Sequence, residues 1–324
     1  MTVAADDAIN AWMATGPRSV ACAVFAAAAA AGCGASGGTP DEELAGLVHA
    51  AKDAPPAIDV DRAASDPVAL GAAIAMPEHS VTDALGAHTL ASKSVVEVSD
   101  GGVVVESLTD DVALDDRGAD FHGTENNSAD YGREAIAVGG QIYLRPRYAR
   151  WHARKPEDGE LAKLRDDLGA ALAADFDLLS PSIAVADRGA AQAAGRAARR
   201  IVVSKAATAR PVAQTLTQRK WRDQAEVLAV SGEVLLDAKT GAPLHAHLEG
   251  ELAFSRDGHR YTMKVSIDHD VSAIGAVAAI APPPADDTVA TPERLHEVDE
   301  RDLLLKSMAP PARKQQPSGS GGTP

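Results

Sequence analysis

Apolar and polar residues alternate strictly in two neighbouring stretches of the chain. From Leu244 to Phe254 every second residue is apolar or small, with Glu249 among the polar positions, and the stretch from Tyr261 to Ile267 repeats the pattern around Lys264. Such alternation is typical of β-strands that bury one face and leave the other in water. The two stretches therefore predict an amphipathic antiparallel pair.

The expected register of this pair follows from a four-residue loop at 255–258, because a slip by one residue would set apolar side chains against charged ones. The run 228–236 adds a third strand to the same apolar face, with Gly232 and Gly250 as positions where the sheet can bend. The predicted pairs are Phe254 with His259, Leu252 with Tyr261, Leu248 with Val265, Ala246 with Ile267, and Glu249 with Lys264.

Turn residues divide the middle of the chain. Beyond Gly86, apolar runs are separated by Gly-rich or Asp-rich turns at 99–102, 115–118 and 139–140, which predicts an antiparallel meander. Between 160 and 179, apolar residues recur at spacings of three and four and predict a helix that ends before Pro181.

The N-terminal third is less regular. Helical spacing predicts a short helix at 40–54. Prolines interrupt the segment 55–85, which we interpret as loop with one strand near Val68 to Ile74.

Cys33 closes the run Ala-Ala-Gly-Cys after a short apolar stretch, and this resembles a bacterial lipobox, in which the cysteine is acylated and the chain is cut before it. The apolar stretch is too short to span a bilayer, so residues 1–32 are interpreted as a signal peptide. We expect Met13 to be the true start, since Arg18 then supplies the leader's positive charge. The competing interpretation is a buried Ala-rich helix that ends in Gly-Cys by chance.

Lipidation at Cys33 would anchor the mature protein to a membrane, with residues 33–40 as a flexible tether. Gly34 after the cysteine favours the outer membrane, facing the periplasm. Cys22 would be lost with the leader, which leaves no cysteine pair for an internal disulfide.

Charge and composition exclude some functions. The chain carries a net charge of −15, and removal of residues 1–32 takes away one arginine and two aspartates, which leaves −14. An acidic surface repels nucleic acid. Aromatic residues make up 3% of the chain, too few for platforms that stack on bases or sugars. We therefore expect no nucleic-acid partner.

The sequence holds no convincing catalytic or metal motif. A Gly-x-Ser-x-Gly match at 34–38 lies in the tether, not at a strand-to-helix turn. His245 and His247 share one face of a strand, but no third ligand follows at a recognisable spacing. We therefore predict a non-enzyme without cofactor or metal.

A basic cluster interrupts the acidic chain and contains two of its few aromatic residues. It could contact lipid head groups or a partner, or it could be an edge strand and loop kept soluble by charge. The cluster comprises Arg145, Arg147, Tyr148, Arg150, Trp151, Arg154 and Lys155.

The lipobox, the long amphipathic sheet, the helix at 161–179 and the strand triplet joined at 237–241 together resemble the LolA, LolB and LppX superfamily of envelope lipid and lipoprotein carriers. The resemblance covers roughly residues 86–281. It implies an α+β fold in which a curved antiparallel sheet, a half-barrel, wraps around a few helices. Residues 41–85 would precede this domain, and 282–324 would form a mostly disordered tail.

The resemblance also implies an apolar cavity for lipid or lipoprotein acyl chains. The alternative is an envelope scaffold or partner-binding lipoprotein with a solid core, because patterning cannot tell whether helices fill the apolar face. The expected cavity wall comprises Leu228, Val230, Val234, Leu248, Leu252, Tyr261, Met263, Val265 and Ile267.

Overall fold

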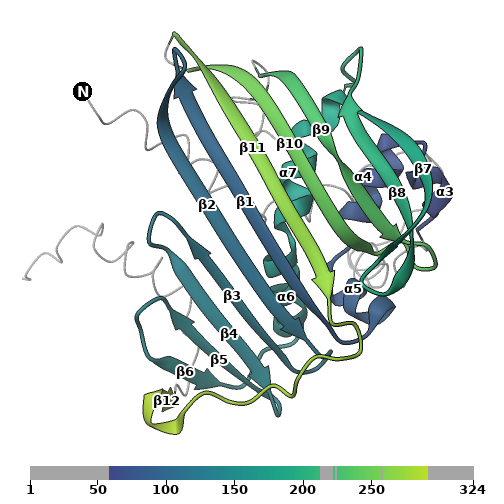
Figure 1. Cartoon of the computed structure of the whole chain (residues 1–324). Helices are drawn as coiled ribbons and strands as arrows, with labels where there is room; N and C mark the ends of the chain where they lie inside the picture. The colour runs from purple at the N-terminus through teal and green to yellow at the C-terminus, as the bar shows by residue number, and fades with distance from the viewer. Residues whose placement is uncertain (1–57, 212–221, 223–224, 257, 291–324) are drawn as a thin grey trace, which may run out of the picture.

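The computed structural model describes residues 58–211, 222, 225–256 and 258–290, so Cys33, the leader and the tether lie outside the described residues. Within them, twelve strands form one open sheet in the order β12-β6-β5-β4-β3-β2-β1-β11-β10-β9-β8-β7 (Figure 1). Neighbouring strands are antiparallel, except that β12 runs parallel to β6.

The helices are α3 (Val60–Ala63), α4 (Pro67–Ile74), α5 (Glu78–Leu85), α6 (Glu160–Gly169) and α7 (Ala171–Leu179), with short 3-10 turns η2 (Ser180–Ser182) and η3 (Ala285–Asp287). The strands are β1 (His88–Asp100), β2 (Val103–Asp116), β3 (Phe121–Asn127), β4 (Gly132–Val138), β5 (Gln141–Pro146), β6 (Trp151–Arg154), β7 (Ile183–Ala193), β8 (Arg196–Lys205), β9 (Glu226–Asp237), β10 (Pro243–Arg256), β11 (His259–Ser272) and β12 (Thr288–Ala290).

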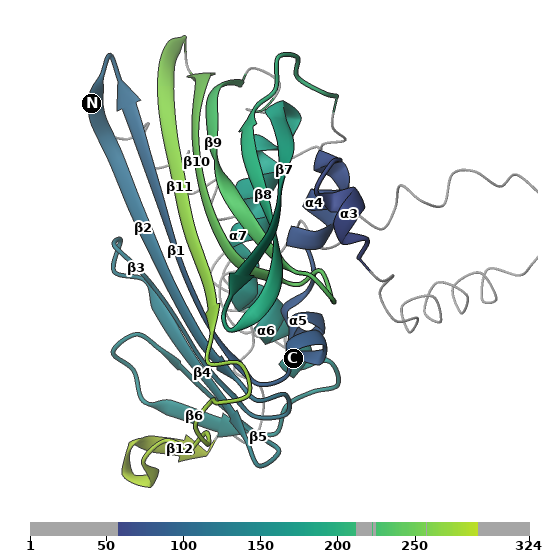
Figure 2. The ribbon, with the colours of Figure 1, turned by 45° about the vertical axis from the view of Figure 1, so that its right-hand side comes forward.

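The sheet is curved, and helices α3 to α7 lie on one side of it (Figure 2). The two-residue repeat of the strands turns the apolar side chains toward these helices and the charged ones toward solvent. The predicted α+β class, with a curved antiparallel sheet around a few helices, is confirmed.

The predicted register of β10 and β11 is wrong by two residues. Arg256 pairs with His259, so two residues lie between the strands instead of four, and Gly258 has a φ of +80°, which tight turns favour. A slip of two residues keeps every side chain on its predicted face, which is why alternation alone could not detect it. The observed pairs are Phe254 with Tyr261, Leu252 with Met263, Leu248 with Ile267, Gly250 with Val265, and Glu251 with Lys264.

The strand predicted near Val68 to Ile74 is also wrong, because these residues form most of α4. Asp66 caps the helix by accepting a hydrogen bond from the Val68 backbone N–H at 2.9 Å. Pro67 occupies the first turn, where its missing N–H costs nothing. Here proline starts the regular element that we expected it to interrupt.

The helix predicted at 160–179 is present as two helices, α6 and α7, which meet at Ala170. Just before the junction, a Cβ on Gly169 would lie 2.7 Å from the Glu78 Oε2 atom of α5. Glycine therefore allows α5 and α6 to approach closely. Farther along the chain, β12 lies within the segment 282–324 that we assigned to a tail, and it pairs with β6.

Candidate functional site

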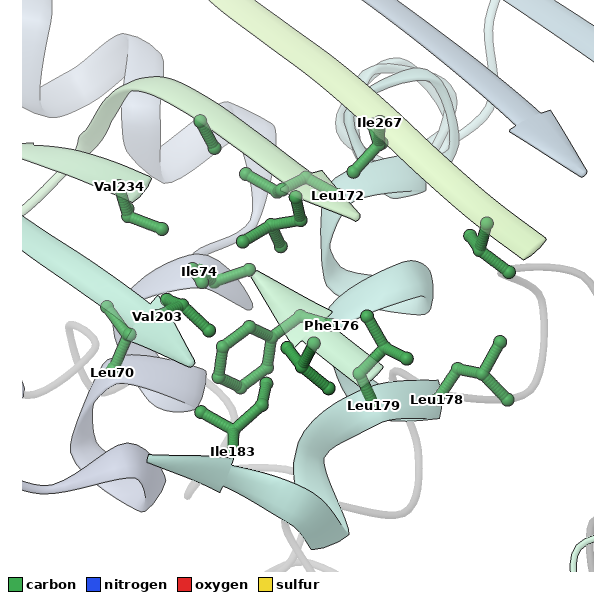
Figure 3. Packing of buried hydrophobic residues seen from close by; sticks show 14 of the residues in the cluster. Leu70, Ile74, Leu172, Phe176, Leu178, Leu179, Ile183, Val203, Val234 and Ile267 are labelled. Atoms are coloured by element: carbon green, nitrogen blue, oxygen red, sulfur yellow. The ribbon is translucent and has the colours of Figure 1, made fainter. Parts of the chain in front are cut away.

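The concave face of the sheet carries a large aliphatic cluster, which packs against α4 and α7 (Figure 3). Phe176 and Leu179 of α7 point into it, together with Leu70 and Ile74 of α4. A Cβ on Gly250 would lie 2.3 Å from the Leu179 Cδ2 atom, so glycine at this position allows α7 to dock directly on β10. We expected Gly250 to bend the sheet, and the structure adds this packing role.

Seven of the nine expected wall residues belong to this cluster: Val230, Val234, Leu248, Leu252, Met263, Val265 and Ile267. Tyr261 is partly buried at its margin and stacks on Phe254, with ring centroids 5.6 Å apart. These eight residues thus share one apolar face, and helical side chains pack against it.

Leu228 is the exception, because β9 contains an irregularity where it pairs with β10. Val227 pairs with Leu252 and Ala229 with Glu251, so Leu228 between them has no directly opposed residue. Val227 takes the buried position and Leu228 is only half-buried. Alternation carries no signal for such a bulge, because the pattern is read as if every residue were paired.

A band of polar residues separates this cluster from a second apolar cluster near α5 and α6. Along β1, Leu90 belongs to the second cluster and Val96 to the first, and Ser92 and Ser94 lie between them. Strand pairing sets His269 of β11 opposite Ser92, and Asp110 of β2 opposite Ser94. With Asp175 of α7, whose carboxyl accepts a hydrogen bond from Ser94 Oγ at 2.8 Å, these residues form what we call the polar band.

Burial changes the charge of the polar band. It raises the pKa of Asp175 to about 7, although the hydrogen bond from Ser94 opposes this shift. Burial and the nearby Glu125 carboxylate raise the pKa of Asp110 to about 6. Burial also lowers the pKa of His269 to about 4. All three side chains are therefore mostly neutral near pH 5, and the two carboxyls become charged as the pH rises past 7.

Two atoms of the band have unused hydrogen-bonding capacity. Ser92 Oγ and His269 Nδ1 are buried without a hydrogen-bond partner in the described part of the chain, and the residues are only 6% and 3% exposed. An unsatisfied buried polar atom costs about 1–3 kcal/mol. Sequence analysis missed this band. In the sequence, two serines stand between the apolar residues of β1, but which residues they meet depends on the pairing of β1 with β11.

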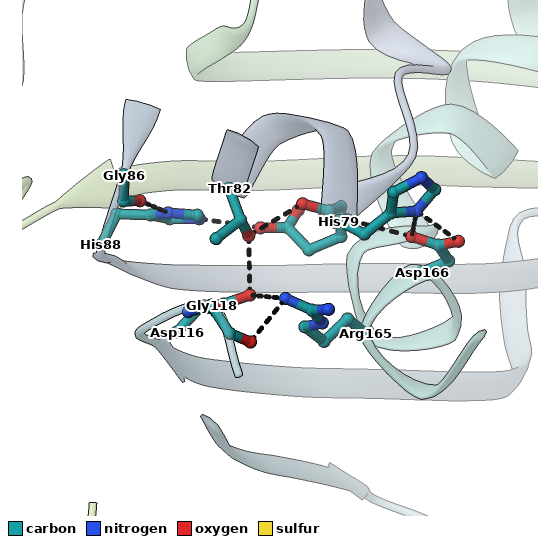
Figure 4. A network of polar contacts seen from close by, with 9 residues as sticks. His79, Thr82, Gly86, His88, Asp116, Gly118, Arg165 and Asp166 are labelled. Carbon is teal, nitrogen blue, oxygen red and sulfur yellow. Dashed lines mark hydrogen bonds and ion pairs between the residues drawn. The ribbon is translucent and has the colours of Figure 1, made fainter. Parts of the chain in front are cut away.

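A second polar network ties α5 and α6 to one end of the sheet (Figure 4). The Nε2 atom of buried His88 lies 2.7 Å from the Oε1 atom of buried Glu78. Thr82 Oγ1 donates a hydrogen bond to the Asp116 carboxylate at 2.7 Å. Arg165 of α6 reaches the same aspartate at 3.5 Å. Although burial alone would lower the pKa of His88, the hydrogen bond and charge of Glu78 raise it. This network fixes α5 and α6 by polar contacts, whereas α7 meets the sheet mainly through aliphatic side chains.

The basic cluster lies around β5 and β6, and acidic neighbours offset much of its charge. Arg145 pairs with Glu134 at 2.6 Å, and its guanidinium lies 4.5 Å from the centre of the buried Trp151 ring. Arg147 lies 3.3 Å from Asp130, Arg150 lies 3.7 Å from Asp287, and Arg154 pairs with Glu160. Tyr148 is 81% exposed, and Lys155 is exposed. Docking through this cluster stays a prediction.

The paired histidines of β10 lie on the solvent face beside aspartates of β11. His245 Nδ1 is 2.7 Å from Asp270, and His247 Nδ1 is 2.6 Å from Asp268. In the described ranges, no group of three or more His, Cys, Asp or Glu residues is arranged to hold a metal ion. No helix in those ranges is both long and apolar enough to cross a membrane.

No protein-family model and no curated protein matches the chain. Among solved structures, lipoprotein LppX of Mycobacterium tuberculosis matches at 16% identity and a TM-score of 0.27, over 67% of this chain and 100% of that one. LprF from Mycobacterium bovis matches at 14% identity and a TM-score of 0.26, over 67% and 98%. A LolA superfamily protein from Nitrosomonas europaea matches at 6% identity and a TM-score of 0.19, over 67% and 96%.

LppX and the LolA protein both belong to the superfamily that the sequence layout resembles. At TM-scores this low, the likeness carries no weight for function.

Proposed function

We propose that this chain is a lipid-anchored, non-catalytic protein of the bacterial cell envelope that binds or transfers lipid or lipoprotein acyl chains on the concave face of its sheet. The observation that best supports this is the aliphatic cluster beneath α4 and α7. Its side chains have the chemistry of an acyl chain, and each methylene that leaves water for such a surface gains about 0.8 kcal/mol.

The way α7 is held also supports binding at this face. Leu172, Phe176 and Leu179 cover the sheet through apolar contacts, and an acyl chain offers the same kind of contact. An acyl chain could therefore replace part of this contact while the polar network keeps α5 and α6 in place. The proposed anchor is Cys33, and the proposed location is the outer membrane facing the periplasm.

A second candidate function is an envelope scaffold with a solid core. The close fit of Leu179 over Gly250 favours it, because a helix packed at that distance leaves no room for a ligand between the two residues. The two functions differ in whether the concave face exchanges helical contacts for lipid.

The test is to express residues 34–324 in a bacterial periplasm, purify them without detergent, and examine them by native mass spectrometry followed by solvent extraction. Stoichiometric co-purified lipid supports the carrier. A lipid-free protein that also fails to take up a fluorescent fatty acid contradicts it and favours the scaffold.

Two matched variants locate the binding face. Ile267→Phe adds bulk to the concave face, and Val95→Phe adds the same ring to the opposite face of the neighbouring strand. We expect I267F to reduce fatty-acid uptake and V95F to leave it unchanged, with circular dichroism to confirm that both are folded. Equal uptake by both variants would place binding elsewhere.

A further inference from the structure

Ser92 and His269 lie directly opposite each other on β1 and β11 and face the helices between the two apolar clusters. Each has a buried polar atom without a hydrogen-bond partner in the described part of the chain. Aliphatic side chains above and below cannot satisfy these atoms. The pair therefore provides polar binding capacity at one level of an otherwise apolar face.

The chemistry of the pair defines what it can bind. A serine hydroxyl both donates and accepts a hydrogen bond, and a neutral imidazole nitrogen does one or the other according to its tautomer. A hydroxyl group placed between them can meet either tautomer, since it too donates and accepts. A carbonyl oxygen can also bind, because the serine hydroxyl and one imidazole tautomer are donors.

The surrounding carboxyls disfavour an anionic ligand. Asp110 of β2 and Asp175 of α7 both lie beside Ser94, one position farther along, so an anion there would meet two carboxyls. Several other charged groups near the band already have partners. Glu125 pairs with Arg133 at 2.6 Å, His88 is hydrogen-bonded to Glu78, and His245 is hydrogen-bonded to Asp270. Burying a charge without a partner is costly.

We propose that Ser92 and His269, beside the Ser94–Asp175 hydrogen bond, bind an uncharged, oxygen-bearing group of the acyl ligand and select it over an anionic head group. This inference rests on the proposed function, since it concerns the head of a ligand whose chain lies on the aliphatic cluster.

The experiment uses residues 34–324, which contain all the described elements, and three ligands with the same 16-carbon chain: monopalmitoylglycerol, palmitate and hexadecylamine. Each displaces the hydrocarbon probe diphenylhexatriene, whose fluorescence reports occupation of the apolar face without any polar head. We expect the neutral glyceride to bind at least roughly tenfold more tightly than palmitate, and hexadecylamine tests whether the two carboxyls bind a cation instead.

Ser92→Ala should reduce the affinity for monopalmitoylglycerol several-fold, roughly the value of one hydrogen bond, and leave diphenylhexatriene binding unchanged. Ser266→Ala, which removes a hydroxyl from the opposite face of β11, is the matched control and should change neither. His269→Leu provides a second, independent variant with the same expected selectivity.

Equal affinities for the three ligands, or wild-type binding of the glyceride by S92A, would overturn the inference while leaving the carrier function standing. A preference for hexadecylamine would overturn it as well and assign the band to cations. Failure of diphenylhexatriene itself to bind would instead refute the proposed function.

Discussion

Asp175 offers the sharpest test of the polar band, because its carboxyl is buried and its protonation is linked to folding. Burial raises its pKa from 3.8 to about 7. The folded protein therefore holds a proton that the unfolded chain releases between about pH 4 and pH 7. The stability that protonated Asp175 contributes is fully present below the pKa of the unfolded chain, and it is lost as the pH rises through the pKa of the folded protein.

The size of the effect follows from the shift. Roughly three pKa units at about 1.4 kcal/mol each give an upper bound of ~4 kcal/mol. Asp175→Asn keeps an oxygen that accepts the Ser94 hydrogen bond and cannot ionise. We expect D175N to match the wild type near pH 3, below the unfolded pKa, and to exceed its unfolding free energy by as much as ~4 kcal/mol at pH 8.

Urea denaturation of residues 34–324 at several pH values measures this difference directly. Subtracting the wild-type curve from that of the variant cancels other titrating groups that the substitution does not touch. Asp83→Asn removes a carboxylate from the exposed surface of α5, away from the polar band, and serves as the control, with a curve parallel to the wild type. A D175N difference that stays constant with pH within about 1 kcal/mol would refute the reasoning.

Three further predictions concern packing, buried charge and the anchor. Gly250→Ala should lower the free energy of unfolding in urea by about 1–3 kcal/mol, because the new methyl group collides with Leu179. Leu179→Ala should therefore lower that free energy less in the G250A variant than in the wild type. Glu78→Ala should lower the free energy of unfolding by about 3–5 kcal/mol, since it removes the carboxylate that pairs with buried His88. Loss of the exposed Arg62–Asp66 pair should change that free energy little. Cys33→Ala should abolish incorporation of an alkyne-labelled fatty acid in a bacterial host, whereas Cys22→Ala should retain it; labelling of the C33A chain would refute the anchor.

The concave face shows how far sequence patterning can locate a candidate site. Alternation in β10 and β11 identified Leu248, Leu252 and Ile267 as inward residues even though the predicted register was wrong by two. It failed at Leu228, where an unpaired residue shifts the strand and Val227 faces inward instead. Pattern thus predicts a face wherever pairing is regular, and it loses that power at a bulge.

The start of α4 combines two residues with opposite local preferences. Proline was interpreted as an interruption, but Asp66 and Pro67 together form a helix start. A proline alone predicts an interruption, whereas a proline directly after an aspartate cap predicts the first turn of a helix.

Side-chain spacing was enough to predict the buried face of the C-terminal strands and the helical segment at 160–179, because each depends on one element alone. The α+β class followed from the layout of these elements along the chain. The β10–β11 register, the close fit of Leu179 over Gly250 and the polar band depend on contacts between elements, so they required the folded structure. Ser92, His269 and Asp175 are far apart in the chain and ordinary in their local context. They become one site because strand pairing and the packing of α7 bring them to the same level of the sheet, where burial, and not sequence, sets their charge.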